Sequence, residues 1–172
     1  MKKALLSLML LAATMPLMAS VMSSRALSDL QLVGQAKLNV LFWEIYHSSL
    51  YSVDGEYQPG HYPIALRIQY LRDIDAQELV DATRDEWKKQ GLSEDQFSSW
   101  LTTLATIWPD IQDGDVLLLR VDEQVHSHFY HNSKPVGEID DPDFGPAFLN
   151  IWLSEKASYP KLRAQLIGKE DE

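Results

Sequence analysis

Cysteine is absent from the 172-residue chain, which excludes disulfide bonds, a thiol nucleophile and any cysteine-ligated metal. Basic residues are scarce too, because 15 Lys and Arg against 25 Asp and Glu leave a formal net charge of −10. Nucleic acids and anionic membrane surfaces are bound through clustered Lys and Arg. The composition therefore argues against both as partners.

Common catalytic and metal-binding motifs are also missing. The sequence has no GxSxG, no HExxH, no phosphate-binding glycine loop and no EF-hand pattern. His126 and His128 lie two residues apart on an expected strand and would share a face, but a metal site needs a third ligand that the sequence does not supply. We therefore expect no metal and no cofactor.

An apolar run approaching membrane length occurs only near the N-terminus. Two lysines precede an apolar run over residues 4–13, which is followed by small residues around Ala19. This order is typical of a secretory signal peptide, and the run is shorter than the roughly 20 residues that cross a bilayer. We expect residues 1–26 to be a signal peptide, cleaved between 19 and 26, and the mature chain to be periplasmic without a stable membrane span. An uncleaved anchor helix is the alternative interpretation.

Residues 27–172 are expected to form one α+β domain, since no repeat, linker or composition break interrupts them. Residues 31–52 predict two strands because β-branched and aromatic residues dominate. Residues 64–70 alternate between apolar and other side chains, which indicates a strand with one buried face. A further antiparallel pair is expected at 116–121 and 125–131.

Two helices should follow the third strand. Asp75 with Glu78, and Ser93 with Gln96, have the spacing of capping boxes. In the second helix, apolar side chains recur at helical spacing around Trp100. This pattern predicts a buried stripe on a helix laid against the sheet.

The last third of the chain is expected to be helical. One helix should begin at Gly145 with Pro146 as its first helical residue, or else at Asp141, and a short last helix should begin at Pro160. Together these elements predict an α+β fold: an antiparallel β-sheet backed by helices on one face.

The segment "LFWEIYHSSLYS" at 41–52 mixes aromatic and hydroxyl side chains. Strand alternation would put Trp43, His47 and Tyr51 on one side, and Tyr46 and Ser48 on the other. Apolar walls with a few polar groups are what a ligand cleft requires. A central strand whose hydroxyls bond to neighbouring backbone is the alternative.

Several segments together resemble bacterial chalcone isomerase-like proteins over roughly residues 31–168. They are "VGQAKLNVLFWEIYHSSLYS", "ALRIQYLRDIDAQELVDATRDEWKKQG", "DGDVLLLRV" and "GEIDDPDFGPAFLNIWLSEKASYPKLRAQLIG". The resemblance implies an antiparallel sheet backed by helices, with a ligand cleft between them. Plant enzymes of this family close a flavanone ring, whereas other members lack that activity and bind fatty acids.

The resemblance also implies where catalytic residues would lie. The enzymes carry an Arg, a Thr, a Tyr and an Asn at positions that fall here on Leu38, Tyr46, Asp75 and Ala82. None of the four is kept, and Lys37, beside the Arg position, lacks the planar fork of a guanidinium. The interpretation therefore leans away from an enzyme.

We expect an exported, non-catalytic protein that binds a small apolar or amphipathic ligand such as a fatty acid. The candidate ligand-binding residues are Lys37, Trp43, Tyr46, Ser48, Tyr51 and Arg67. An isomerase or lyase with a divergent active site, using His47, Tyr46 or Asp75, is one alternative. An envelope protein that contacts another protein is a second alternative, and the sequence leaves the oligomeric state undefined.

Overall fold

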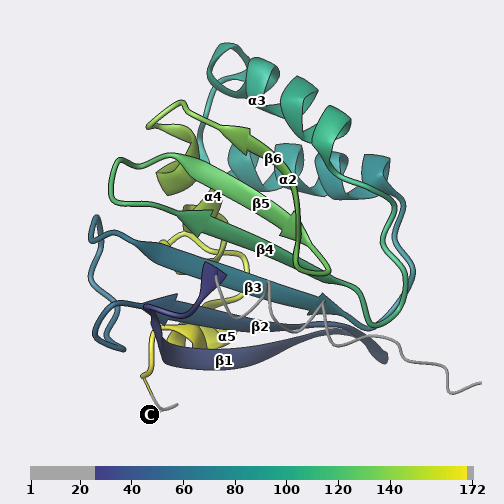
Figure 1. Cartoon of the computed structure of the whole chain (residues 1–172). Helices are drawn as coiled ribbons and strands as arrows, with labels where there is room; N and C mark the ends of the chain where they lie inside the picture. Colours follow the sequence, from purple (N-terminus) through teal and green to yellow (C-terminus); the bar gives the residue numbers. More distant parts are fainter. Residues whose placement is uncertain (1–25, 170–172) are drawn as a thin grey trace, which may run out of the picture.

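The computed structural model describes residues 26–169, so all but the last residue of the predicted signal peptide lies outside the described residues. Six strands form one antiparallel sheet in which each strand pairs with the next along the chain (Figure 1). They are β1 (Gln31–Val40), β2 (Trp43–Ser52), β3 (Ile64–Tyr70), β4 (Val116–Val121), β5 (Ser127–His131) and β6 (Lys134–Ile139).

Four helices back this sheet (Figure 1). They are α2 (Ala76–Gln90) and α3 (Glu94–Ile107), between β3 and β4, and α4 (Phe144–Leu153) and α5 (Pro160–Leu166), after β6. The predicted α+β architecture, an antiparallel sheet with helices on one face, is confirmed. Within residues 26–169, no helix has the length and apolar character needed to cross a bilayer.

Only one of the two expected capping boxes forms. The backbone N–H of Ser93 donates to Gln96 Oε1 at 2.8 Å, as predicted for the start of α3. Asp75 is the N-cap of α2, but its side chain makes no capping bond. The N–H of Ala76 donates instead to Asp110 Oδ1 at 2.9 Å, so a carboxylate from the α3–β4 connection replaces the local cap.

The start of α4 falls between the two predicted starts. Asp143 is the N-cap and Phe144 the first helical residue. Pro146 therefore lies in the first turn, where a backbone N–H would have no partner within the helix and its absence costs little.

The apolar stripe of α3 is buried as predicted, and the helix packs along α2 as well as against the sheet, which it meets at the edge strand β6. Trp100 and Phe97 pack against Trp87 of α2, with ring centroids 5.4 Å and 5.7 Å from it. On its other side α3 approaches β6 so closely that a Cβ on Gly137 would lie 2.5 Å from Ile107 Cγ2. The helix thus rests on a second helix and an edge strand, away from the centre of the sheet.

The opposite face of the sheet carries a smaller apolar cluster. Ala26 packs with Ala65 and Leu118 there. Arg120 fixes this N-terminal segment by donating from both terminal guanidinium nitrogens, Nη1 and Nη2, to the Asp29 carboxylate, at 2.7 Å and 2.8 Å. These hydrogen bonds from Arg120 lower the pKa of Asp29 below its usual value.

Candidate functional site

A cavity of about 380 Å³ lies between the sheet and the helices. Its volume falls in the range of small-molecule sites. The strands contribute mainly aliphatic side chains to its wall, among them Leu66, Ile68, Leu117 and Leu119. The helices contribute Leu79, Phe148, Ile151, Trp152 and Leu162. Most of the wall is therefore apolar.

A β-bulge in β2 shapes one side of this cavity. Leu38 pairs with Tyr46 and Asn39 with Glu44, so Ile45 is an extra residue on β2. Bulges re-aim side chains and increase local twist. The Ile45 carbonyl accepts a hydrogen bond from Leu71 N–H at 2.9 Å, and both Ile45 and Tyr46 line the cavity.

The bulge also reverses the alternation predicted for the start of β2. Trp43 pairs with Val40, and Val40 lies two residues from Leu38, a cavity-lining residue. Directly paired side chains share a face of the sheet, so Trp43 projects on the face of Tyr46. The expectation that Trp43 faces the same way as His47 is wrong, because a prediction from regular alternation does not account for the extra residue of a bulge.

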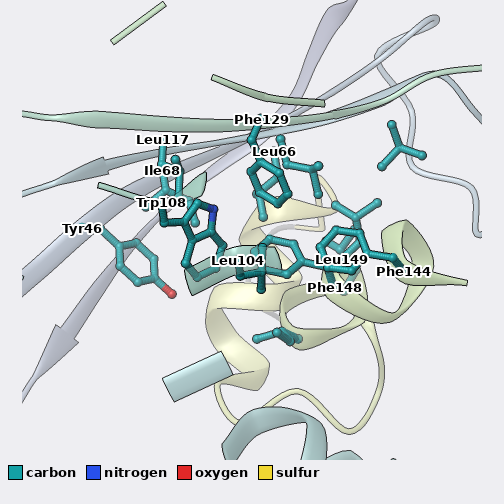
Figure 2. Packing of buried hydrophobic residues seen from close by; sticks show 14 of the residues in the cluster. Tyr46, Leu66, Ile68, Leu104, Trp108, Leu117, Phe129, Phe144, Phe148 and Leu149 are labelled. Atoms are coloured by element: carbon teal, nitrogen blue, oxygen red, sulfur yellow. The ribbon is translucent and has the colours of Figure 1, made fainter. Parts of the chain in front are cut away.

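Two tyrosine hydroxyls are the main polar groups on the sheet side. The Tyr46 hydroxyl accepts a hydrogen bond from Trp152 Nε1 at 2.8 Å, and in Figure 2 it points away from the strands. Tyr70 packs edge-on against Tyr46, with ring centroids 6.1 Å apart. Burial raises the pKa of both tyrosines, so both hydroxyls stay neutral.

Charged side chains occur at the rim of the cavity. Glu86 accepts hydrogen bonds from Lys89 Nζ and from Ser158 Oγ, both at 2.7 Å, so its charge is balanced within the protein. Arg72 lies two residues after the end of β3 and is exposed. In the described part of the chain it forms no ion pair, not even with Glu78 on the same rim. An apolar interior with an unpaired guanidinium at its edge suits a ligand with one anionic end.

The six predicted ligand-binding residues do not gather in one place. Tyr46 lines the cavity. Lys37 and Arg67 line an open groove on the opposite face of the sheet, whereas Ser48 is fully buried on the face of Tyr46, paired with Ile68. Lys37 is paired there with Glu44, and the Ser48 hydroxyl donates to the Ala36 carbonyl at 3.2 Å.

The remaining two predicted residues lie elsewhere. Tyr51 belongs to the small apolar cluster of the outer face, and Trp43 lies exposed near the tip of the β1–β2 hairpin. The set is split because adjacent residues of a strand point to opposite faces. A ligand role for the five residues outside the cavity stays a prediction.

Arg72, Tyr70 and Trp152 belong to the cavity but were not among the predicted site residues. Alternation along 64–70 did place Tyr70 on the buried face of its strand. Trp152 lies in an apolar helix whose facing residues cannot be read from sequence. Arg72 carries no local signal, because its position depends on where β3 ends and α2 begins.

Comparison with known proteins identifies the family. A sequence profile described as chalcone isomerase-like matches residues 15–168, and the chain belongs to that family. A protein from Haemophilus influenzae, described as uncharacterized, is 26% identical over 153 residues, covering 88% of this chain and 75% of its own.

The fold is shared with a solved structure. A fatty-acid binding protein from Arabidopsis thaliana superposes with a TM-score of 0.61 at 13% identity, covering 81% of this chain and 87% of the plant protein. At this identity the likeness shows the fold alone.

Three of the four positions that correspond to catalytic residues of the family's enzymes line the cavity. They carry Leu38, Tyr46 and Ala82, whereas Asp75 at the start of α2 does not line it. The cavity therefore includes three of the positions that the resemblance assigns to catalytic residues, and it lacks the guanidinium and amide groups that the resemblance assigns to the enzymes.

Proposed function

We propose that the protein binds a long-chain fatty acid, or a similar amphipathic carboxylate, in the cavity and does not transform it. The observation that carries the proposal is the apolar cavity with the unpaired Arg72 at its rim. A carboxylate held by a guanidinium forms short, charge-assisted hydrogen bonds. The plant protein with the same fold, described as fatty-acid binding, supports the choice of ligand class.

The size of the cavity sets the expected affinity. A water molecule takes up about 30 Å³, so a cavity of about 380 Å³ holds on the order of a dozen methylene-sized groups. At about 0.8 kcal/mol per buried methylene, the gross gain is roughly 10 kcal/mol. Loss of translational and rotational freedom offsets at least about 4 kcal/mol of this. The remainder, at most about 6 kcal/mol, corresponds to a dissociation constant of tens of micromolar or weaker.

The chemistry of the wall supports binding over catalysis. Tyr46 and Tyr70 have raised pKa values and are poor proton acceptors or donors near neutral pH. The positions that would hold a polarising Arg and an Asn carry Leu38 and Ala82. A divergent isomerase would need a general acid or base in the cavity. Glu86 is occupied by Lys89 and Ser158, and the other carboxylate of the lining, Glu78, is exposed to solvent at the rim.

Calorimetric titration with saturated fatty acids of increasing length tests the proposal. Affinity should rise about fourfold per added methylene until the chain fills the cavity, and then level off. Arg72→Gln should weaken carboxylate binding at least about tenfold and leave binding of the matching fatty alcohol unchanged. Arg67→Gln, on the outer face, is the matched control. Absence of binding, or equal loss in both variants, would contradict the proposal.

We also propose that the chain is exported to the periplasm, supported by the lysines and apolar run at its N-terminus. N-terminal sequencing of the periplasmic fraction should then begin between Ser20 and Leu27. Recovery of protein that begins with Met1 would show that the segment is retained.

A further inference from the structure

The turn between β1 and β2 exposes an unbroken apolar segment, which we call the hairpin tip (residues 40–43). The exposed fractions of its side chains are 39% for Val40, 87% for Leu41, 99% for Phe42 and 68% for Trp43. Tyr46 pairs with Tyr70, the last residue of β3, so the tip extends past the neighbouring strand. In Figure 1 the β1–β2 ribbon projects at the end of the sheet where β3 leads into α2.

The backbone of the tip is not one that apolar residues favour. Val40 pairs with Trp43, so Leu41 and Phe42 form a two-residue turn, and Leu41 has φ 55°. Glycine is the usual residue at such a position, because a side chain with φ above zero is crowded by the following carbonyl. The turn therefore keeps a strained leucine where a polar or small residue would form it more easily. The formation of the turn therefore does not explain why its residues are apolar.

The tip continues directly into the cavity wall. Trp43 and Val40 project on the same face of the sheet as Leu38. Ile45, two residues after Trp43, lines the cavity. The bond from Leu71 N–H to the Ile45 carbonyl brings the chain that carries Arg72 to this same end. An apolar track thus runs from the exposed tip to the cavity and its cationic rim.

The shape of the tip favours a bilayer over a second protein chain as its partner. Two aromatic side chains enclose about 150–250 Å² each, so with two aliphatic neighbours the tip offers roughly 500 Å². A stable protein interface needs about 800 Å² from each partner. A bilayer encloses a narrow projection on every side, and aromatic residues with apolar neighbours are typical of segments that enter its interface.

The charges around the tip indicate a neutral lipid surface. Within the hairpin, Lys37 is neutralised by Glu44. Carboxylates crowd the loops at the same end, where Asp113 N–H donates to Asp73 Oδ1 at 2.8 Å. These carboxylates would repel anionic headgroups. Binding there has to come from apolar insertion.

We propose that Leu41, Phe42 and Trp43 insert into the surface of a zwitterionic phospholipid bilayer and set the rim of the cavity against it. Docking itself does not depend on what the cavity holds. The exchange of a fatty acid by this route rests on the proposed function.

Flotation with phosphatidylcholine and phosphatidylethanolamine vesicles tests the docking of the mature chain. The double variant Leu41→Asn/Phe42→Ser should lower the vesicle-bound fraction at least about tenfold. Its melting temperature should be equal or higher, because Asn tolerates positive φ. The matched control is Leu32→Ser/Val53→Ser, which alters two exposed apolar side chains at the other end of the same strands. Equal loss in the control would overturn the proposal.

Fluorescence gives an independent readout, since Trp43 is the exposed tryptophan while Trp87, Trp100 and Trp108 are buried. Vesicles should shift its emission to the blue, brominated lipids should quench it, and Trp43→Phe should remove both changes. Adding phosphatidylglycerol should change vesicle binding by no more than about twofold. A strong dependence on anionic lipid, or no blue shift, would overturn the assignment.

Two further measurements separate the alternatives. Fatty-acid affinity without vesicles should be the same in the wild type and the Leu41→Asn/Phe42→Ser variant. Normal vesicle docking without fatty-acid binding would therefore contradict only the proposed function. Fatty-acid binding without vesicle docking would contradict only the docking. Light scattering should show the same mass for both forms, and a wild-type dimer that the tip variant converts to monomer would assign the tip to a second copy.

Discussion

The helix-covered side of the sheet has a filled half and a hollow half, and both are rich in aromatic residues. In the filled half, under α3, the Trp100 ring contacts Trp87 and Phe144 at centroid distances of 5.4 Å and 5.7 Å. In the hollow half, where residues of β1 to β5 line the cavity, Tyr46 and Tyr70 pack on each other and otherwise border the cavity. Aromatic content alone therefore does not distinguish a core from the wall of a site.

The polar atoms of the aromatic side chains do distinguish the two halves. In the filled half, Trp87 Nε1 donates to the Ala147 carbonyl at 3.0 Å and Trp100 Nε1 donates to Asp141 Oδ2 at 2.8 Å. In the hollow half, Trp108 Nε1 is buried with no hydrogen-bond partner within the described residues. The indoles of Trp87 and Trp100 are therefore satisfied within the protein, whereas Trp108 Nε1 is left for a ligand or water to meet. Among the described residues Ser127 Oγ, beside Gly145, is likewise buried with no partner, so this contrast holds for the indoles and not for every polar atom.

The largest effect is expected in the filled half. Trp100→Ala should lower the free energy of unfolding by roughly 3–5 kcal/mol, because it removes a buried indole and leaves a cavity. Chemical denaturation measures this loss. Trp100→Phe is the matched control, which keeps a ring and gives up the bond to Asp141. A loss below about 1 kcal/mol for Trp100→Ala would mean that this half is not the stabilising one.

In the hollow half a larger side chain should be tolerated and should exclude the ligand. Ile68 is buried on β3 and lines the cavity. Ile68→Phe should lower fatty-acid affinity at least about tenfold, because the added ring occupies ligand volume, while stability changes by less than about 1.5 kcal/mol. Calorimetry and denaturation on the same variant measure both. Ile68→Val should retain binding, and a severely destabilised Ile68→Phe would show that the space is not available.

The sequence predicted the elements of both halves but not which half would be hollow. Period-two alternation identified β3, and helical periodicity identified the buried stripe around Trp100, because both patterns follow from burial of one face. The face of the sheet on which Trp43 lies could not be predicted, because Trp43 precedes the extra residue Ile45 and the bulge there depends on pairing with β1. Lys37 and Arg67, the cations expected to meet a carboxylate, lie on the outer face, where regular alternation along β3 puts Arg67, while Arg72 takes the rim.

The link between β2 and α4 across the hollow half gives the smallest expected effect. The Tyr46 hydroxyl accepts a hydrogen bond from Trp152 Nε1 at 2.8 Å. Tyr46→Phe should lower the free energy of unfolding by about 1 kcal/mol, since it removes that acceptor and leaves the indole N–H without one. Trp152→Phe should have a similar effect, and the double variant should show a coupling energy of about 0.5–1.5 kcal/mol. The contrary outcome is a coupling energy close to zero in ligand-free protein together with a large loss of fatty-acid affinity for Tyr46→Phe. The Tyr46 hydroxyl would then serve the ligand and not the wall, and Tyr46 would belong with the groups that a ligand completes.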